Sequence, residues 1–529
     1  QITTLNVNGF ANLWYLMCEN NPLTSLFIKT GHYISELNYY SNTPVLEYIC
    51  VDDDQIAAIE ARNAALGYTN CHVNSYCTFT PGGTYYTIQG NTKYDSNNNG
   101  CDAADLPYPN LKLSISDGIH DGHIIANGSG NYHNTVEAGT HTFSPVLENP
   151  SYFIITPTTA SVTFPVATSP FTRDFCVAPN GIHNDLEIAV IPMNNARPGF
   201  DTTYKILYKN KGTQSQSSFV TLTFDDTKMD LVAATPSISS QAVNSLSWSF
   251  SNLQPFESRT ILVTFNLNTP SETPALNSGD VLNYTASVNG VSDETLDDNS
   301  ASVSQEVVNS FDPNEKTCVE GKIVTQNLVG QDVHYVIRFE NNGTANAQNI
   351  VIKDIIDTTK YDINSLIPLA GSAAYVTRIK NTNQVEFIFE NINLPFDDAN
   401  NDGFVAFKIK TKPTLLVGDS FSNTANIYFD YNFPITTNTA TTTIAALGSP
   451  DFEFNSAYTL SPVPAKNILN ITTKQTRTMR SASIYNQLGQ LILVTTTPKT
   501  IDVSGLKAGS YFIKVVSDNG SATTKFLKE

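Results

Sequence analysis

The chain has 529 residues, more than one hydrophobic core usually serves, so we expect three to five domains. Hydrophobic residues make up 40% and charged residues 15% of the chain, a balance that suits β-sandwiches with polar turns and excludes a disordered polymer. The 30 basic and 49 acidic side chains give a net charge of −19, which argues against a nucleic-acid partner. No apolar run approaches the ~20 residues of a transmembrane segment.

The first fifty residues carry apolar residues at a regular spacing. The pattern consists of Leu13, Leu16, Cys18, Asn21, Leu23, Leu26 and Ile28. Its apolar members would face the interior of a solenoid, and Asn21 would bond the backbone of the turn beneath it. The segment resembles the short leucine-rich repeats of bacterial surface proteins, which implies a surface ligand for the repeats. The alternative is an ordinary strand-rich segment.

Residues 52–66 form the best helix pattern in the chain, with acidic residues in the first turn and Gly67 at the end. We interpret this helix as a cap that closes the solenoid. Residues 1–80 are therefore predicted to be leucine-rich repeats with a helical cap.

The chain has seven cysteines, an odd number that cannot all pair internally, and a local disulfide among those near residue 70 would fit an oxidising compartment. Cys50, Cys71 and Cys77 lie close enough in sequence for one local disulfide, whose pairing the spacing leaves open. We expect Cys18 to point into a core. The chain has no Cys-x-x-Cys pair, which excludes a zinc ribbon and a thioredoxin-like motif.

Short alternating strands follow over residues 84–172. This segment resembles the prealbumin-like B-type repeats of bacterial adhesins, which are small sandwiches that act as stalk units. The resemblance departs at residues 126–132, where the family usually carries an acidic turn.

An Asn-rich loop near the start of this segment is a candidate calcium site. Its donors would be the side chains of Asp95, Asn97, Asn99 and Asp105 and a backbone carbonyl near Cys101. Oxygen ligands at alternate positions, with a glycine at the bend, are typical of a loop that wraps a hard cation. Calcium is the one cofactor that we expect, and an Asn-rich β-turn is the alternative.

The middle of the chain contains an internal repeat. Three landmarks recur in the same order at offsets of 131, 132 and 139 residues: 204–213 with 335–344, 227–231 with 359–363, and 279–280 with 418–419. We therefore predict two immunoglobulin-like sandwiches, at residues 173–308 and 309–446. Motifs within them resemble a conserved pair of domains in Bacteroidetes surface proteins, which implies a fold and no activity.

Residues 452–529 form a third kind of unit. Its landmark residues are Pro462, Pro464, Gly489, Gly509, Tyr511, Lys525 and Phe526. The unit resembles the type A C-terminal sorting domain of the type IX secretion system, with Pro-Val-Pro at 462–464 where the family has Pro-Asn-Pro. The resemblance implies a translocon and a shuttle protein as partners, followed by cleavage and attachment to the cell surface or release.

The residue pattern of this unit agrees with a recognition role. Tyr511, Ile513 and Val515 would place apolar groups on one face of a strand, with Phe512, Lys514 and Val516 on the other face. Gly489 and Gly509 would supply turns with unusual backbone angles. The last strand is expected at 523–527, where it would present a free edge to a partner.

We predict a mostly β chain: the end of a leucine-rich-repeat solenoid, a prealbumin-like sandwich, two immunoglobulin-like sandwiches that serve as spacers of a stalk, and a C-terminal β-sandwich sorting domain. The chain has no nucleophile elbow, His-Glu-x-x-His, P-loop or dinucleotide-binding motif, so we expect no catalytic residue.

The expected function is that of a secreted protein on the outer-membrane surface, or released from it, which acts as an adhesin or recognises a ligand. One alternative is a component of gliding motility or of the surface assembly of the secretion machinery. The other alternative is a fragment of a secreted hydrolase whose catalytic domain is absent.

Overall fold

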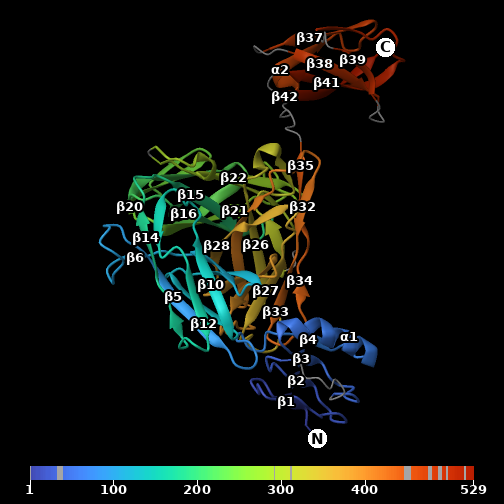
Figure 1. Cartoon of the computed structure of the whole chain (residues 1–529). Helices are drawn as coiled ribbons and strands as arrows, with labels where there is room; N and C mark the ends of the chain where they lie inside the picture. The colour runs from blue at the N-terminus through green and yellow to red at the C-terminus, as the bar shows by residue number, and fades with distance from the viewer. Residues whose placement is uncertain are drawn as a thin grey trace. The chain divides into compact units, whose positions relative to one another are not determined.

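The computed structural model describes residues 2–32, 40–290, 292–309, 313–398, 400–445, 454–474, 479–486, 491–495, 499–517 and 520–529. Strands account for 50% of the chain and helices for 4%, which confirms the mostly β class. The chain divides into two compact units, Gln1–Thr443 and Ile444–Glu529 (Figure 1). Residues 1–443 thus pack as one body, and the expected stalk of separate sandwiches is wrong. Within the described residues, no helix combines the length and apolar character needed to cross a bilayer.

The N-terminal module (residues 2–32 and 40–80) is built on a parallel sheet. Its strands are β1 (Thr4–Asn6), β2 (Ser25–Phe27), β3 (Tyr48–Cys50) and β4 (His72–Asn74). The first residues of successive strands pair as Thr4–Ser25, Ser25–Tyr48 and Tyr48–His72, at intervals of 21, 23 and 24 residues. Leu26 and Ile49 are fully buried in the interior behind this sheet.

The predicted role of Asn21 is confirmed, because its side-chain oxygen accepts the backbone N–H of Ile2 in the neighbouring turn at 3.3 Å. Its amide also donates to the carbonyl oxygens of Cys18 and Glu19 in its own turn, both at 3.2 Å. Cys18 is buried in the interior, as expected. Helix α1 (Ile56–Leu66) follows the 3-10 turn η1 (Asp53–Gln55) and ends at Gly67, whose φ is 78°. Since α1 connects β3 to β4, it is a crossover between parallel strands; the prediction of a cap after the last strand is wrong.

The first sandwich follows the N-terminal module. Its strands are β5 (Tyr86–Tyr94), β6 (Leu106–Pro107), β7 (Lys112–Ser116), β8 (Asp121–Ile125), β9 (Asn131–Val136), β10 (Gly139–Val146), β11 (Phe153–Thr156), β12 (Ala160–Phe164), β13 (Phe171–Thr172) and β14 (Phe175–Pro179). One sheet contains β12-β10-β7-β8 and the other β11-β14-β5-β13. Ile88, Phe143 and Val177 lie in the core between them, so the sandwich continues beyond residue 172.

Copy one of the internal repeat contains β15 (Leu186–Pro192), β16 (Asp201–Asn210), β17 (Gln216–Thr223), β18 (Met229–Thr235), β19 (Ser240–Ala242), β20 (Ser245–Leu253), β21 (Ser258–Leu267), β22 (Val281–Val288), the 3-10 turn η2 (Leu296–Asp298) and β23 (Ser300–Glu306). Its two sheets have the orders β15-β16-β21-β18 and β19-β20-β17-β22-β23. Trp248 and Tyr284 are among the large side chains that fill the core.

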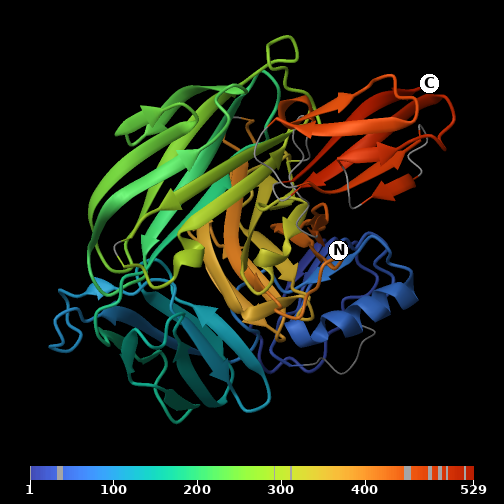
Figure 2. The ribbon, with the colours of Figure 1, turned by 90° about the horizontal axis from the view of Figure 1, so that it is seen from above.

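Copy two contains β24 (Lys316–Cys318), β25 (Ile323–Thr325), the 3-10 turn η3 (Gln326–Leu328), β26 (Asp332–Glu340), β27 (Ile350–Ile355), β28 (Tyr361–Gly371), β29 (Val376–Lys380), β30 (Gln384–Phe389), β31 (Asp402–Thr411), β32 (Ser420–Asn423), β33 (Ala425–Phe429), β34 (Ile435–Thr436) and β35 (Ala440–Ala445). Figure 2 shows copy one in green beside copy two in yellow and orange. Val336 and Ala406 of copy two share the hydrophobic cluster of copy one, so the copies are packed together.

Matching side chains show that the copies repeat one local structure. The amide of Asn210 donates to the carbonyl oxygens of Gln214 and Leu253, at 2.7 and 2.9 Å. Asn341 donates in the same way to Ala345 and Leu394, at 2.9 and 3.0 Å. Each asparagine also accepts the backbone N–H two residues later, so the Asn-x-Gly segment is held by the same three bonds in both copies.

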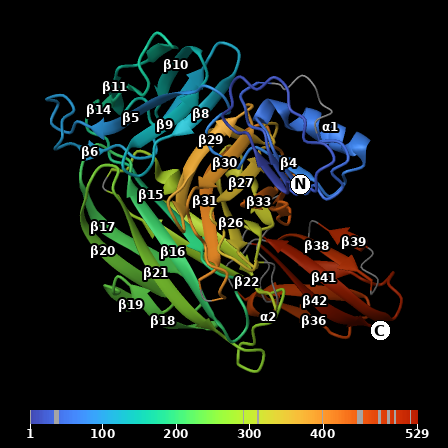
Figure 3. The ribbon, with the colours of Figure 1, turned by 90° about the horizontal axis from the view of Figure 1, so that it is seen from below.

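Backbone pairing joins the first sandwich to copy two. Strand β8 pairs antiparallel with β29, and the partners include Ile125 with Thr377 and His123 with Ile379 (Figure 3). The result is a continuous sheet with the order β12-β10-β7-β8-β29-β30-β27-β33-β34. Because each strand occupies the open edge of the other, two domains far apart in sequence form a single rigid layer.

A buried lysine connects three of the modules. The ammonium group of Lys408 in β31 lies 2.9 Å from Glu148 of the first sandwich and 3.5 Å from Asp332, and it also bonds Glu187 of copy one. The side chain of Lys408 is 2% exposed. Burial lowers its pKa, but the carboxylates of Glu187, Glu148 and Asp332 outweigh burial and hold the pKa above its ordinary value.

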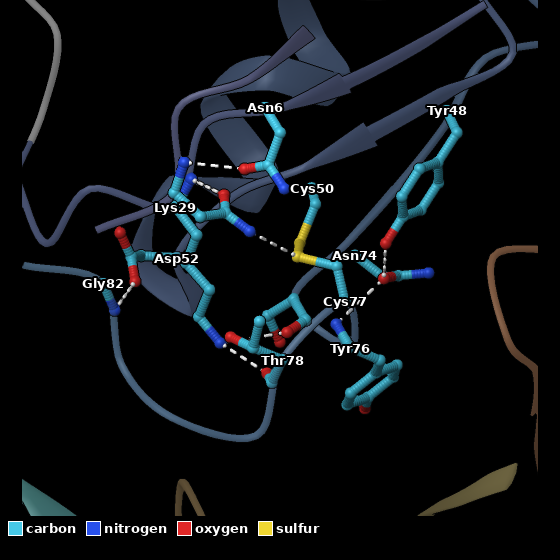
Figure 4. The surroundings of a disulfide bond; sticks show 12 residues. Asn6, Lys29, Tyr48, Cys50, Asp52, Asn74, Tyr76, Cys77, Thr78 and Gly82 are labelled. Carbon is cyan, nitrogen blue, oxygen red and sulfur yellow. Dashed lines mark hydrogen bonds between the residues drawn. A yellow bond between two sulfur atoms is a disulfide. The ribbon is translucent and has the colours of Figure 1, made fainter. Parts of the chain in front are cut away.

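Two disulfides are present in the described residues. Cys50 bonds Cys77 (Figure 4), with 6.1 Å between their Cα atoms. Cys71 remains a free thiol. Cys101 bonds Cys176, which ties the Asn-rich loop to β14 across a separation of 75 residues. The sequence did not predict this second bond, since spacing contains no information on distant partners.

A buried polar network surrounds the first disulfide (Figure 4). The ammonium group of Lys29 donates to the carbonyl oxygens of Ser75 and Thr78, at 3.0 and 2.9 Å. Burial lowers the pKa of Lys29 to about 8. Asp52 accepts the backbone N–H of Gly82 at 2.8 Å. These bonds hold residues 75–82 against the parallel sheet, and the disulfide joins Cys77 of this segment to Cys50 of β3.

The substitution Lys408→Ala is expected to lower the free energy of unfolding by about 3–5 kcal/mol, because it leaves the buried carboxylate of Glu187 without its cation. The matched control is Lys322→Ala, since the Lys322 side chain is 77% exposed in its pair with Glu306. That control is expected to cost less than about 1 kcal/mol. Differential scanning calorimetry of the full chain measures both, and equal losses of Tm would contradict the role of Lys408.

Mass spectrometry of the non-reduced chain should identify one crosslinked peptide pair with Cys50 and Cys77 and another with Cys101 and Cys176, while Cys71 is alkylated. Reduction is expected to lower Tm, because the bonds close loops of 27 and 75 residues, and loops of this size are worth roughly 3–5 kcal/mol each. A crosslink that contains Cys71 would contradict the pairing.

Candidate functional site

The C-terminal unit is a small sandwich. It contains the helix α2 (Phe454–Ala457) and the strands β36 (Tyr458–Ser461), β37 (Ile468–Thr473), β38 (Met479–Tyr485), β39 (Leu491–Thr495), β40 (Thr500–Asp502), β41 (Gly509–Ser517) and β42 (Gly520–Lys528). Its described sheets have the orders β36-β37-β40 and β39-β38-β41-β42. Leu469, Ile484 and Val515 are fully buried between them, so this unit has its own core.

The alternation predicted for β41 is present. Ile513 and Val515 are fully buried, whereas Phe512 is 39% exposed on the other face. Tyr511 stacks on Phe526 of β42 with 5.8 Å between ring centroids. Phe526 thus points into the core and its neighbour Lys525 is exposed, as the period-two geometry of a strand requires.

The last strand lies at the edge of its sheet, because β42 follows β41 at the end of the strand order. One end of this edge is not free. The backbone N–H of Ala465 donates to the Leu527 oxygen at 2.8 Å, and the N–H of Glu529 donates to the Ala465 oxygen at 2.9 Å. The expectation of a free edge over 523–527 is therefore corrected at its C-terminal end, where Ala465 pairs with the chain terminus.

The predicted sorting motifs lie at different places in this sandwich. Pro462 and Pro464 are in the connection from β36 to β37, and Pro464 directly precedes Ala465, so this motif places the residue that pairs with the last strand. Gly509 begins β41 and pairs with Lys528. Its φ of 158° is one that residues with a side chain rarely adopt, so the expected unusual backbone angle is present, but Gly509 is the first residue of a strand and the expected turn is wrong. Gly489 lies outside the described residues.

In the N-terminal module, the outer face of the parallel sheet is covered by copy two. Tyr431 stacks on Tyr48 with 5.2 Å between centroids and meets Phe27 edge-on at 5.4 Å. Phe433 lies 4.2 Å from the ring of His72. Tyr48 is consequently 2% exposed. The strand face that a leucine-rich repeat would offer to a ligand is thus occupied by this chain's own aromatic residues.

Polar contacts fix the same interface. The ammonium group of Lys380 lies 2.7 Å from Asp53 and 3.1 Å from Glu386. The hydroxyl of Tyr76 donates to Glu386 at 3.0 Å. The carboxylate of Glu386 is buried. The ammonium group of Lys380 and the hydroxyl of Tyr76 offset the cost of removing this charge from water. These contacts hold the N-terminal module on copy two.

The Asn-rich loop forms a tight turn around Asp95, which is 4% exposed. The carboxylate of Asp95 accepts the N–H of Asn99 at 3.2 Å and the N–H of Gly100 at 2.8 Å. Asn97, which lies between Asp95 and Asn99 in the sequence, has an exposed side chain. Asp105 accepts the N–H of Asp102 at 2.7 Å, so both predicted acids also order their own backbone. Calcium binding by this loop stays a prediction.

Comparisons with known proteins identify two segments. Residues 459–529 match the family described as the secretion system C-terminal sorting domain, and residues 312–443 match a domain of unknown function, DUF7619. A search of curated proteins found no match.

Solved structures show sheet-rich likenesses of low identity. The major pilin subunit of Bacillus cereus shares 9% identity over 79% of this chain and 95% of its own, with a TM-score of 0.19. The BSP domain of a biofilm associated protein shares 10% identity over 65% and 81%, with a TM-score of 0.22. The C-terminal domain of the antigen I/II-family protein AspA of Streptococcus pyogenes shares 13% identity over 50% and 99%, with a TM-score of 0.18.

The sorting-domain match agrees with the geometry of the C-terminal unit, which has a separate core and an edge strand at the chain end. The match implies interaction with the type IX secretion machinery. It marks the chain as a secreted, cell-surface protein.

Proposed function

We propose that this protein is a non-enzymatic surface protein, an adhesin or ligand-recognition protein, which the type IX secretion system delivers through residues 452–529. The sorting-domain match carries the proposal. Residues 1–443 form the cargo: a body of packed modules held together by a shared sheet and a buried ion network. A rigid body of this kind is suited to presenting a preformed surface to a ligand.

The N-terminal module is proposed to be the end of a leucine-rich-repeat array. Its intervals of 21, 23 and 24 residues between paired strands agree with the roughly 20–29 residues of such repeats. The amide of Asn21, which bonds the backbone of its own turn, supports this proposal. Because Tyr431 covers the strand face, ligand recognition is assigned to another surface of the body.

We also propose that the Asn-rich loop binds calcium. Gly100 is the sixth residue counted from Asp95 and has a φ of 94°. Calcium loops place an invariant glycine at this sixth position for the sharp turn, and they draw oxygen ligands from positions one, three and five. Asp95, Asn97 and Asn99 occupy those positions, and Asp105 would add a second carboxylate.

Removal of calcium with EGTA is expected to lower the Tm measured by calorimetry. An ion that binds only the folded loop stabilises the folded state by mass action. Asp105→Asn should weaken this response, whereas Asp398→Asn, at an exposed position of copy two, should leave it unchanged. A Tm that is identical with calcium and with EGTA would leave the loop as a simple turn.

A fluorescent protein fused to residues 452–529 is expected to reach the surface of a bacterium with a type IX system, because the C-terminal unit has its own core. The same reporter without the tail should stay inside, and so should a tail with Ile513→Asp, which places a charge at a fully buried position. Fluorescence microscopy and protease accessibility measure the location.

Retention of the intact reporter in the periplasm would contradict export by this tail.

Deletion of the full gene should reduce adhesion of the cells while gliding and secretion of other cargo continue. Loss of gliding would instead favour a component of the motility or secretion assembly.

A further inference from the structure

A groove of about 1010 Å³ lies where the first sandwich meets copy two. Strands β8 and β29 pair at this junction (Figure 3). Ile125 and Thr377, which are partners in the pairing, both line the groove. Its volume is at the upper end of the roughly 300–1,000 Å³ typical of ligand sites. Because one sheet connects both sides, the groove is preformed and binding would require little reorganisation.

The side from the first sandwich is rich in neutral polar groups. They are the side chains of Gln89, Asn91, Asn110, Asn127, Ser129 and Asn131. Asn91 donates to Asn131 at 2.8 Å, and its backbone N–H donates to Asp174 at 2.7 Å. Asn127 accepts the N–H groups of Ser129 and Asn131, both at 3.0 Å. These bonds hold the amides in position before any ligand arrives.

The side from copy two contributes an aromatic ring. Tyr375 lines the groove and packs against Phe389 and Phe387, with centroid distances of 5.3 and 6.1 Å. Gly371 allows this packing, since a Cβ at that position would lie 2.5 Å from the Tyr375 ring. The ring is therefore held in place beside the amide-rich side.

The charge of the lining excludes some classes of ligand. Asp174 and Glu390 are carboxylates, and among the described residues that line the groove none is a lysine or an arginine. An anionic ligand would meet these carboxylates without a compensating cation. A purely apolar ligand would strip water from the amides without replacing their hydrogen bonds.

We propose that this groove binds a neutral oligosaccharide. A sugar ring presents C–H groups on its face and hydroxyl groups at its rim, which suits one fixed aromatic ring and a row of planar amides. A peptide strand would instead be read by an open sheet edge, and β8 and β29 pair with each other at the junction. The proposal names a ligand class for the recognition role proposed above and rests on that role.

The test uses the full chain and four neutral hexasaccharides, the cello-, xylo-, manno- and malto- forms, with hexagalacturonate as the acidic comparison. Isothermal titration calorimetry should detect binding of at least one neutral probe and no binding of the acidic one. Ala374→Trp, at an exposed position that lines the groove, should abolish binding, and Ala138→Trp, at an exposed position outside its lining, should leave it intact. Asn131→Ala should weaken binding about tenfold through the lost hydrogen bonds.

Absence of binding by all four neutral probes, or preference for the acidic probe, would overturn the proposal. Binding that survives Ala374→Trp would also overturn it. If cells that carry Ala374→Trp adhere as well as the parent, the recognition role stands and the groove is excluded as its site. If adhesion and probe binding are both lost in this variant while Ala138→Trp keeps both, the groove and the recognition role are supported together.

Discussion

The pairing of β8 with β29 is the constraint on which the body of this protein depends. It connects two domains that are separated by all of copy one in the sequence, and it closes an open edge of each. Open edges invite pairing with other chains, so a protein that functions outside the cell benefits from closing them internally. The same pairing forms the junction at which the amide-rich groove lies.

Charge and covalent bonds strengthen this arrangement. Lys408 bonds carboxylates of the first sandwich and copy one, and Lys380 joins copy two to the N-terminal module. The buried pairs of Lys408 contribute little net stability compared with apolar packing, but they penalise any arrangement that leaves one partner alone. The ion pairs therefore specify how the modules dock, while the disulfides restrict the unfolded chain.

We propose that export and recognition belong to separate units of the chain. The C-terminal unit has its own core, and Ala465 and Gly509 both pair with the end of its last strand. The body carries the surfaces available for a ligand, and its own Tyr431 covers the outer face of the parallel sheet. This contact moves the search for a ligand site from the N-terminal module to the junction of the first sandwich with copy two.

The sequence by itself determined the features that depend on neighbouring residues. The period-two pattern around Ile513 was found where predicted, and the predicted repeat of residues 204–213 at 335–344 has a matching structure, in which Asn210 and Asn341 each bond a carbonyl oxygen four residues later. Only the tertiary structure decided the bond between Cys101 and Cys176 and the partners of Lys408. These depend on surfaces brought together from residues up to 260 positions apart, and the free energy of that docking is not encoded in any local pattern.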